Sequence, residues 1–415
     1  MIKIYDMETL EEREILFRGG SGADVSAPVA EILRAVQERG DAALREYTLR
    51  FDGAAPDALA VTAEEVDQAA AQVEPAFLAV LEEAAEHIRA YHARQKRESF
   101  VMTEREGVVL GQRIIPLARV GIYVPGGTAA YPSTVLMNAI PARIAGVGEI
   151  IMVTPPGRDG AVNPHILAAA KIAGVTRIYK VGGAQAVAAL AYGTGTIPQV
   201  DKIVGPGNAY VAEAKRQVFG RVNIDMIAGP SEVLVLADGR SNPAWVAADL
   251  LSQAEHDRMA AAVLVTDSRP LAEAVAHELE RQLAALPRAE IARASLEANG
   301  KLIVCRDLRE GIAVANRIAP EHLELCVDNP FDYLGEIQNA GSVFLGRYNP
   351  EPMGDYFAGP NHTLPTMGTA RFYSPLSVDD FVKKSQFSYY TRDALARDYR
   401  KVSLFARKEG LDAHA

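Results

Sequence analysis

The chain has 415 residues, of which 49% are hydrophobic and 23% charged, and its formal net charge is −10. This composition is typical of a globular protein with room for two domains. The negative charge argues against a nucleic-acid partner, because a polyanion needs a basic surface to displace its counterions. The start of the chain, Met1–Glu14, carries acidic residues and no uninterrupted apolar stretch. We therefore expect no signal peptide, no spanning helix and no membrane partner, and predict a cytoplasmic protein.

The N-terminal part of the chain favours helices. Apolar residues at helical spacing predict one helix over Val29–Tyr47 and another, facing the core, from Pro75. Between them, Thr62 and Glu65 have the spacing of a capping box, in which hydroxyl and carboxylate each accept from a free amide at a helix start. Farther along, Cys305 and Cys326 lie in or beside apolar strand-like runs, which favours reduced core residues over a disulfide.

From about Arg113 onward, short β-branched runs alternate with helical stretches, which indicates parallel sheets covered by helices. About ten strands are too many for one simple doubly wound unit, so we expect two sheets. The predicted strands are Val120–Val124, Ile150–Val153, Arg177–Val181, Lys202–Val204, Val222–Ile227, Val233–Ala237, Ala261–Thr266, Leu302–Cys305, Leu323–Val327 and Ser342–Leu345. The predicted helices between them are Ser133–Ala145, His165–Ala173, Ala184–Tyr192, Ala209–Phe219, Pro243–His256, Leu271–Leu286 and Leu308–Ile318.

Four glycine-rich turns follow predicted strands in this region. Glycine at the carboxyl end of a strand lets backbone amides approach a ligand, and the helix start that follows favours phosphate. A single turn of this kind is more often only a tight connection, but four together indicate a nucleotide site. The region contains no G-x-G-x-x-G fingerprint. The turns are Tyr123-Val-Pro-Gly-Gly127, Gly182-Gly-Ala-Gln185, Gly205-Pro-Gly-Asn208 and Ala228-Gly-Pro-Ser231.

A polar cluster interrupts the apolar chain at Leu250–Asp257. If the stretch is helical, as Asn242-Pro243 suggests, Gln253 and His256 are three residues apart and share one face. Such a pair can hold a cation, although in isolation it is more often a solvated helix end.

Polar residues that could take part in catalysis become frequent after Ile318. Pro320-Glu-His322 puts a carboxylate and an imidazole at the start of an apolar strand, and both can meet one substrate only if the backbone turns there. The alternative is a satisfied surface pair. The loop Tyr348–Pro365 carries Asp355 and His362 and is typical of a segment ordered around a ligand.

The last segment, Asp379–Ala415, favours an amphipathic helix, and its final His414 would by itself indicate a frayed tail.

Together, these residues resemble the histidinol dehydrogenase family over nearly the whole chain. No single motif identifies the reaction, but their combination is specific. The motifs are Val120-Gly-Ile-Tyr-Val-Pro-Gly-Gly127, Gly182-Gly-Ala-Gln-Ala-Val187, Val204-Gly-Pro-Gly-Asn-Ala-Tyr210, Asp225-Met-Ile-Ala-Gly-Pro-Ser-Glu232, Ser252-Gln-Ala-Glu-His-Asp257, Pro320-Glu-His-Leu-Glu324, Gly354-Asp-Tyr-Phe-Ala-Gly-Pro-Asn-His362 and Glu409-Gly-Leu-Asp-Ala-His414.

The resemblance implies an α/β fold with two Rossmann-like domains, each an incomplete, mostly parallel sheet with helices on both faces, and small helical extensions at both ends. Residues 1–29 would form the N-terminal extension. Residues 30–119 and 233–365 would form a first domain with the metal and catalytic residues, and residues 120–232 a second domain that binds NAD. Residues 366–415 would form a helical tail that reaches the partner subunit of a homodimer.

The activity implied by the resemblance is the oxidation of L-histidinol to L-histidine through the aldehyde, with NAD reduced in both steps and one zinc ion per subunit. Zinc would orient the substrate, since it has no redox role of its own. His322 would accept the alcohol proton and Glu321 would activate water for attack on the aldehyde. This division of roles is a hypothesis.

The resemblance also assigns each site residue. The catalytic residues would be Glu321 and His322, and the NAD contacts would be Tyr123, Gln185 and Asn208. The zinc ligands would be Gln253, His256, Asp355 and His414. The substrate contacts would be these ligands together with Ser231, His322, His362 and Glu409.

Three alternatives remain at this stage. A dehydrogenase of the same fold could act on another small polar alcohol. A zinc hydrolase would share the ligand set but leave the glycine-rich turns unexplained. A non-catalytic nucleotide-binding module would explain the turns but not the pair Glu321-His322.

Overall fold

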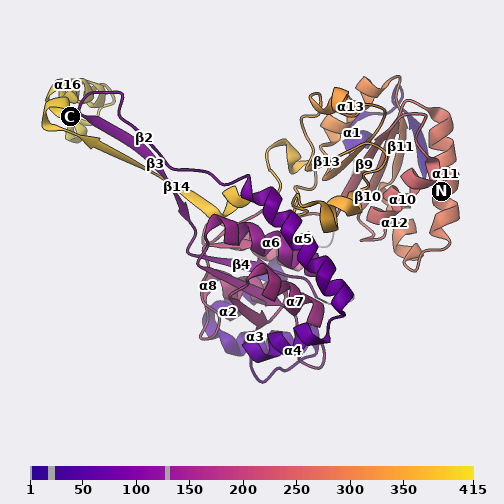
Figure 1. The fold of residues 1–415 in the computed structure, drawn as a ribbon, viewed down its shortest axis with the longest axis horizontal. Helices are drawn as coiled ribbons and strands as arrows, with labels where there is room; N and C mark the ends of the chain where they lie inside the picture. The colour runs from indigo at the N-terminus through magenta and orange to yellow at the C-terminus, as the bar shows by residue number, and fades with distance from the viewer. Residues whose placement is uncertain (1, 17–23, 127–130) are drawn as a thin grey trace.

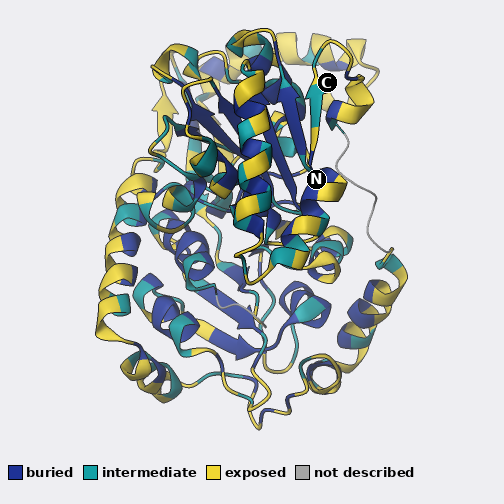
Figure 2. Ribbon diagram, turned by 90° about the vertical axis from the view of Figure 1, so that its right-hand side faces the viewer, coloured by how far each residue is buried: buried dark blue, intermediate teal, exposed yellow. Residues whose placement is uncertain are grey.

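A computed structural model describes residues 2–16, 24–126 and 131–415. The protein consists of two parallel sheets, each flanked by helices, and an arm that projects from the body (Figure 1). Both sheets are buried at the centre of their layers, and the covering helices expose their outer faces (Figure 2). Among the described residues, no helix is both long and apolar enough to cross a membrane.

The first sheet has six parallel strands in the order β1-β11-β10-β9-β12-β13. Side chains alternate along each strand, so Ala262 and Leu264 face one helical layer while Val263 and Val265 face the other. The strands are β1 (Lys3–Asp6), β9 (Glu232–Ala237), β10 (Ala261–Thr266), β11 (Lys301–Val304), β12 (His322–Cys326) and β13 (Ser342–Leu345). The helices are α10 (Pro243–Ala254), α11 (Arg269–Leu283) and α12 (Ala289–Asn299) on one face, and α1 (Glu12–Leu16) and α13 (Leu308–Ile318) on the other, with α14 (Phe331–Leu334) after β12.

The second sheet has five parallel strands in the order β6-β5-β4-β7-β8. Its strands are β4 (Arg119–Tyr123), β5 (Glu149–Thr154), β6 (Arg177–Lys180), β7 (Lys202–Val204) and β8 (Asn223–Ile224). One face is covered by α4 (Ala63–Gln72), α5 (Pro75–Ala93), α6 (Pro132–Ala145) and α7 (Pro164–Ala173). The other face is covered by α2 (Ser26–Arg39), α3 (Asp41–Asp52), α8 (Gly183–Tyr192) and α9 (Ala209–Val218).

The arm combines segments from both halves of the sequence. Its central strand β3 (Val108–Pro116) pairs antiparallel with β2 (Phe100–Met102) and with β14 (Val382–Tyr390). Helix α16 (Arg392–Lys408) follows β14, and the C-terminus lies at the tip of the arm (Figure 1). Apolar side chains are exposed along the arm, among them Phe100, Val101, Met102, Tyr389, Leu395, Tyr399, Val402, Leu404 and Phe405.

The predicted α/β class with two parallel sheets is confirmed, as is the capping box of Thr62 and Glu65 at the start of α4. The predicted helix Val29–Tyr47 is wrong, because Gly40 has a φ of 54° and divides it into α2 and α3. The tail is not entirely helical either, because β14 precedes α16 and is anchored by β3.

The structure also corrects the predicted division into domains. Residues 30–119 were expected with residues 233–365, but helices α2–α5 pack on the five-stranded sheet, through pairs such as α2 with α8 and α5 with α6. The N-terminal extension is likewise not separate, since β1 is the edge strand of the six-stranded sheet.

One segment crosses between the two sheet domains. It contains the short helix α15 (Glu351–Met353), a single π-helical turn η1 (Gly354–Ala358), and the residues up to Met367. Two of its hydrogen bonds reach helices of the five-stranded sheet domain: His87 Nδ1 lies 2.8 Å from the carbonyl oxygen of Phe357, and Asn361 Nδ2 donates to the carbonyl of Met137 at 2.6 Å. The segment, which was predicted to be an ordered loop, is therefore partly helical and packed from both sides.

Candidate active site

The predicted catalytic pair lies at the amino end of β12. Ala319 ends α13 with a left-handed φ of 51°, and Pro320 follows, so the backbone turns just before the strand begins. Beside them, the neighbouring strand β9 begins at Glu232, whose N–H donates to Glu321 Oε2 at 2.9 Å. The carbonyl of Glu232 accepts from His322 Nδ1 at 2.9 Å. Glu321 Oε2 and His322 Nδ1 are 3.7 Å apart, so both side chains face one small volume.

Burial and neighbouring charges shift the pKa values of both side chains. Burial raises the pKa of Glu321 to about 7, although the neighbouring His322 charge opposes the shift. For His322, burial alone would lower the pKa, but the charges of Glu321 and Asp355 raise it to about 10. Because the Glu232 carbonyl can only accept, the Nδ1 of His322 carries a hydrogen and Nε2 is the atom left for chemistry.

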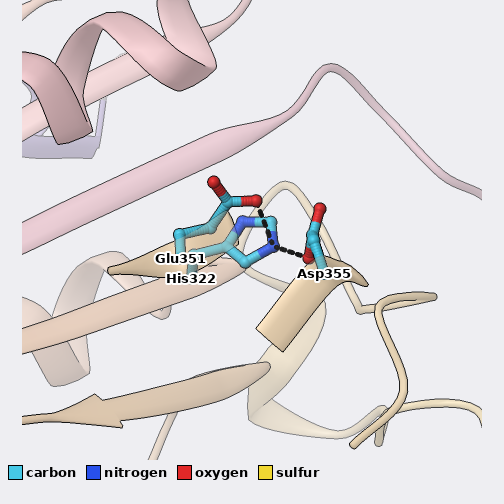
Figure 3. Close-up of side chains that lie close together, drawn as sticks. All are labelled: His322, Glu351 and Asp355. Atoms are coloured by element: carbon cyan, nitrogen blue, oxygen red, sulfur yellow. Dashed lines mark ion pairs between the residues drawn. The ribbon is translucent and has the colours of Figure 1, made fainter. Parts of the chain in front are cut away.

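Two carboxylates converge on Nε2 of His322 (Figure 3). Asp355 Oδ1 lies 3.5 Å from this nitrogen and Glu351 Oε1 lies 3.9 Å from it. Burial raises the pKa of Glu351 to about 8, whereas His322 holds the pKa of Asp355 well below its usual range despite burial. The π-helical turn η1 aims Asp355 into this cluster, as such turns often do at functional sites.

Helix α10 supplies the next polar group. Gln253 lies in its last turn and is 1% exposed. Among the described residues its side-chain amide makes no hydrogen bond of good geometry, although it lies close enough to Glu351 to lower the pKa of that carboxyl. A buried amide in this state is unfavourable unless a ligand completes it. His256 follows just after the helix and is exposed to solvent.

The remaining predicted substrate contacts divide into two groups. His362 is half-buried, and its Nδ1 lies 2.9 Å from the carbonyl oxygen of Asp355, while Ser231 immediately precedes β9. Glu409 and His414 are exposed at the end of the arm, which in the same chain extends away from the six-stranded sheet (Figure 1). The single chain therefore does not bring them to the other site residues.

The other sheet has a topological switch point. The strand order reverses between β4 and β7, and ligands of parallel α/β sheets bind at the carboxyl ends of strands at such a point. Tyr123 ends β4, and its hydroxyl accepts from the N–H of Gly183 at the start of α8, at 3.1 Å. Gly205 follows β7 with a φ of 110°, and a Cβ there would lie 2.2 Å from the Tyr123 carbonyl oxygen. Three of the glycine-rich turns thus meet here, although Gly127 lies outside the described residues.

Polar atoms without hydrogen-bond partners lie in the turns at this switch point. The side-chain amide of Gln185, in the first turn of α8, is buried, and neither its oxygen nor its nitrogen has a partner in the part of the chain that the structure describes. Asn208 caps α9 by accepting from two backbone amides, so its amide nitrogen stays available. A cavity of about 870 Å³ opens beside Gly126 and Pro155, at the carboxyl ends of β4 and β5.

The chain was compared with known proteins. The family model described as histidinol dehydrogenase matches residues 18–415. A histidinol dehydrogenase of Listeria monocytogenes serotype 4b is 55% identical over 408 residues, which are 98% of this chain and 95% of that protein. One from Geobacter sulfurreducens is 58% identical over 405 residues, which are 96% of this chain and 94% of that protein.

The chain belongs to the histidinol dehydrogenase family. A crystal structure of histidinol dehydrogenase from Elizabethkingia anophelis is 41% identical and superposes with a TM-score of 0.95, covering 100% of this chain and 96% of that one. Because this superposition covers the whole chain, the two proteins share their fold as well as their sequence family.

Two polar residues of this family member were not singled out from its sequence. Glu351 stands in the loop as one acidic residue among several, and only the structure shows that it approaches His322. Asp52 ends α3 beside the cavity; burial raises its pKa to about 6, and its Oδ2 has no partner within the described ranges. A carboxylate in the last turn of a helix opposes the helix dipole, and that was the one available signal.

Proposed function

We propose that this chain catalyses the NAD-dependent, four-electron oxidation of L-histidinol to L-histidine through histidinaldehyde, the last two steps of histidine biosynthesis, in the cytoplasm. The observation that carries the proposal is the buried pair Glu321 and His322, placed against a cluster of metal-capable side chains in a member of this family. Two oxidations of one carbon need a proton acceptor for the alcohol and an activated water for the aldehyde, and this pair offers one group for each.

The residues present fit a zinc ion. Gln253 has a buried amide whose hydrogen bonding is incomplete, and Asp355 has a carboxylate whose pKa is held low, so both are suited to bind a cation. We propose Gln253, His256, Asp355 and the partner subunit's His414 as ligands, one ion per subunit. A mixed nitrogen and oxygen set leaves room for substrate. When bound, zinc would hold the substrate's amine and imidazole and would lower the pKa of His322 toward working pH.

In the first oxidation, Nε2 of His322 accepts the proton of the alcohol as hydride leaves the carbon for NAD. The hydrogen bond from Nδ1 to the Glu232 carbonyl fixes the tautomer and the ring plane for this transfer. His362 and Ser231, which border the same volume, would contact the substrate together with Glu409 of the partner subunit.

In the second oxidation, Glu321 accepts a proton from water as its oxygen adds to the aldehyde carbon. A pKa of about 7 suits this role, because the carboxylate is both available and basic near neutral pH. The proton that His322 took from the alcohol returns to the former carbonyl oxygen, which gives the hydrate. The hydrate gives up its hydride to another NAD, and His322 takes the hydroxyl proton back. Burial of both residues would shield the reactive aldehyde from bulk water.

The switch point of the five-stranded sheet would bind NAD. We propose Tyr123, Gln185 and Asn208 as contacts, since the first two flank the point where the strand order reverses and the third stands at a helix start. The segment Glu351–Met367, which packs on both domains, would bring nicotinamide and substrate together.

We further propose a homodimer in which each arm completes the partner's active site. The arm exposes a row of apolar side chains, and on α16 only Ala394 and Ala406 are buried. Such a surface is unfavourable in water and is typical of an interface between subunits. A partner would also bring Glu409 and His414 to a site that the same chain leaves incomplete.

The stoichiometry of NADH tests the reaction itself. Protein, excess NAD and limiting L-histidinol are mixed, and NADH absorbance is followed to its endpoint. We expect about two NADH per histidinol, because both oxidations reduce NAD at the same site. Incubation with a chelator should abolish the signal and added zinc should restore it. No NADH would exclude a dehydrogenase in favour of a hydrolase or binding module, and activity only with other small alcohols would exclude histidinol as substrate.

Gln185 offers a test of the nucleotide site by stability. In the absence of NAD its buried amide lacks hydrogen bonds, so Gln185→Leu should raise the free energy of unfolding by about 1 kcal/mol. The same change should raise the KM for NAD about tenfold or more, since the amide can no longer bind it. Chemical denaturation with and without NAD measures both effects. If NAD stabilised the variant as much as the unmodified protein, Gln185 would not be a contact.

A further inference from the structure

A second carboxyl pair lies behind the candidate active site. Glu324, two residues after His322 on β12, is fully buried, and its carboxyl is within hydrogen-bonding reach of Asp249 on α10. Burial raises the pKa of Glu324 to about 9 and that of Asp249 to about 6. Two carboxyl groups so close together share one proton, because both cannot be ionised side by side in a buried place.

The pair also reaches the segment that carries Asp355. Oε1 of Glu324 accepts from the backbone N–H of Glu351 at 2.8 Å, at the start of α15. On α10, the Ser252 hydroxyl donates to the Asp249 carbonyl at 2.7 Å and lies 3.4 Å from Glu351 Oε2. Strand β12, helix α10 and the α15–η1 segment therefore meet at one buried point.

We propose that Asp249 and Glu324 form a proton-sharing clamp that positions α10 and the α15–η1 segment relative to each other. The protonated oxygen of Glu324 donates to Asp249, and its other oxygen accepts from Glu351 N–H. The clamp thereby sets the spacing between Gln253 on α10 and Asp355 on η1, and this consequence rests on the proposed metal site. Both members are positioning residues, since neither lies at the reacting atoms.

The clamp needs a donor and an acceptor at position 324, and a charge is not required. Glu324→Gln supplies both, because the amide nitrogen can donate to Asp249 while the amide oxygen accepts from Glu351 N–H. Glu324→Leu supplies neither and leaves a buried N–H without a partner. Leu325→Val is the matched control, because it disturbs packing at the next residue of β12, on the opposite face of the sheet.

The first measurement is amide hydrogen exchange over residues 351–357 in the metal-free protein. We expect Glu324→Leu to speed exchange there about tenfold, and Glu324→Gln and Leu325→Val to leave it within about twofold. The second is zinc affinity, measured by competition with a chromophoric chelator. Loss of the clamp should weaken zinc binding by about tenfold or more, as for other residues that orient metal ligands, and Glu324→Gln should rescue it.

The outcomes distinguish a failure of the clamp from a failure of the proposed metal site. Unchanged exchange in Glu324→Leu, or equal impairment in Glu324→Gln and Glu324→Leu, would overturn the clamp. If the unmodified protein bound no zinc, the proposed metal site would fail, and the exchange comparison would still decide whether the clamp exists. In steady-state kinetics, loss of the clamp should raise the KM for histidinol more than it lowers kcat in zinc-saturated enzyme, whereas a general loss of fold would lower the active fraction alone.

Discussion

Glu321→Gln is expected to slow the oxidation of histidinaldehyde roughly a thousandfold while slowing the oxidation of histidinol by less than about tenfold. The amide oxygen can still accept from the N–H of Glu232, so the backbone around the site keeps its hydrogen bond. The amide cannot take a proton from water, and only the second oxidation needs an activated water. Single-turnover measurements that start from the alcohol and from the aldehyde separate the two steps.

The pH dependence of aldehyde oxidation provides a second test of the role of Glu321. Because burial raises the pKa of Glu321 to about 7, the carboxylate becomes protonated as the pH falls through that value, and the aldehyde step should slow accordingly. This dependence should vanish in Glu321→Gln. The control is Glu324→Gln, another neutralised glutamate at the same strand, which should retain both steps. Equal losses in the two oxidations of Glu321→Gln would assign the proton transfers differently.

The sequence was sufficient to predict two sheets covered by helices, but not to predict which helices cover which sheet. Parallel strands buried on both faces appear as apolar runs, and those runs located β9, β10 and β12 closely. The helices α2–α5 have apolar faces that would suit either sheet, so only tertiary contacts decide that they cover the five-stranded one. Strand β14 escaped prediction because all its residues after Val382 are exposed, which leaves no apolar alternation to detect.

In the candidate site, too, some contacts could be predicted from the sequence and others could not. A turn at Pro320 was compatible with Glu321 and His322 meeting, and the family resemblance favoured that arrangement over a surface pair. The structure places Glu321 Oε2 3.7 Å from His322 Nδ1. Glu351 could not be foreseen, because its approach to His322 depends on the packing of α15 against β12, where its backbone N–H donates to Glu324. Local sequence gives no signal for such a contact, since it depends on how segments far apart in the chain pack together.

A substitution at the end of the arm tests the proposed dimer most directly. His414→Ala should remove a metal ligand and lower the rate of histidine formation by a hundredfold or more, on the order of what loss of a ligand costs. A hybrid dimer with His414→Ala in one subunit and Glu321→Gln in the other is then informative. If each arm serves the partner, the subunit with His414→Ala keeps its own Glu321 and receives the partner's His414. One site of the hybrid is therefore intact.

Two differently tagged subunits, co-expressed and purified through both tags, give this hybrid free of the parental dimers. We expect it to form histidine at about half the rate of the unmodified dimer, because one of two symmetric sites is complete. Each parental homodimer, with the same defect in both sites, should stay nearly inactive. If an arm folded back onto its own subunit instead, both sites of the hybrid would be defective, and no activity would return. Zinc content should instead follow the number of intact His414 side chains, with about two ions bound at full strength in the Glu321→Gln homodimer, one in the hybrid and none in the His414→Ala homodimer.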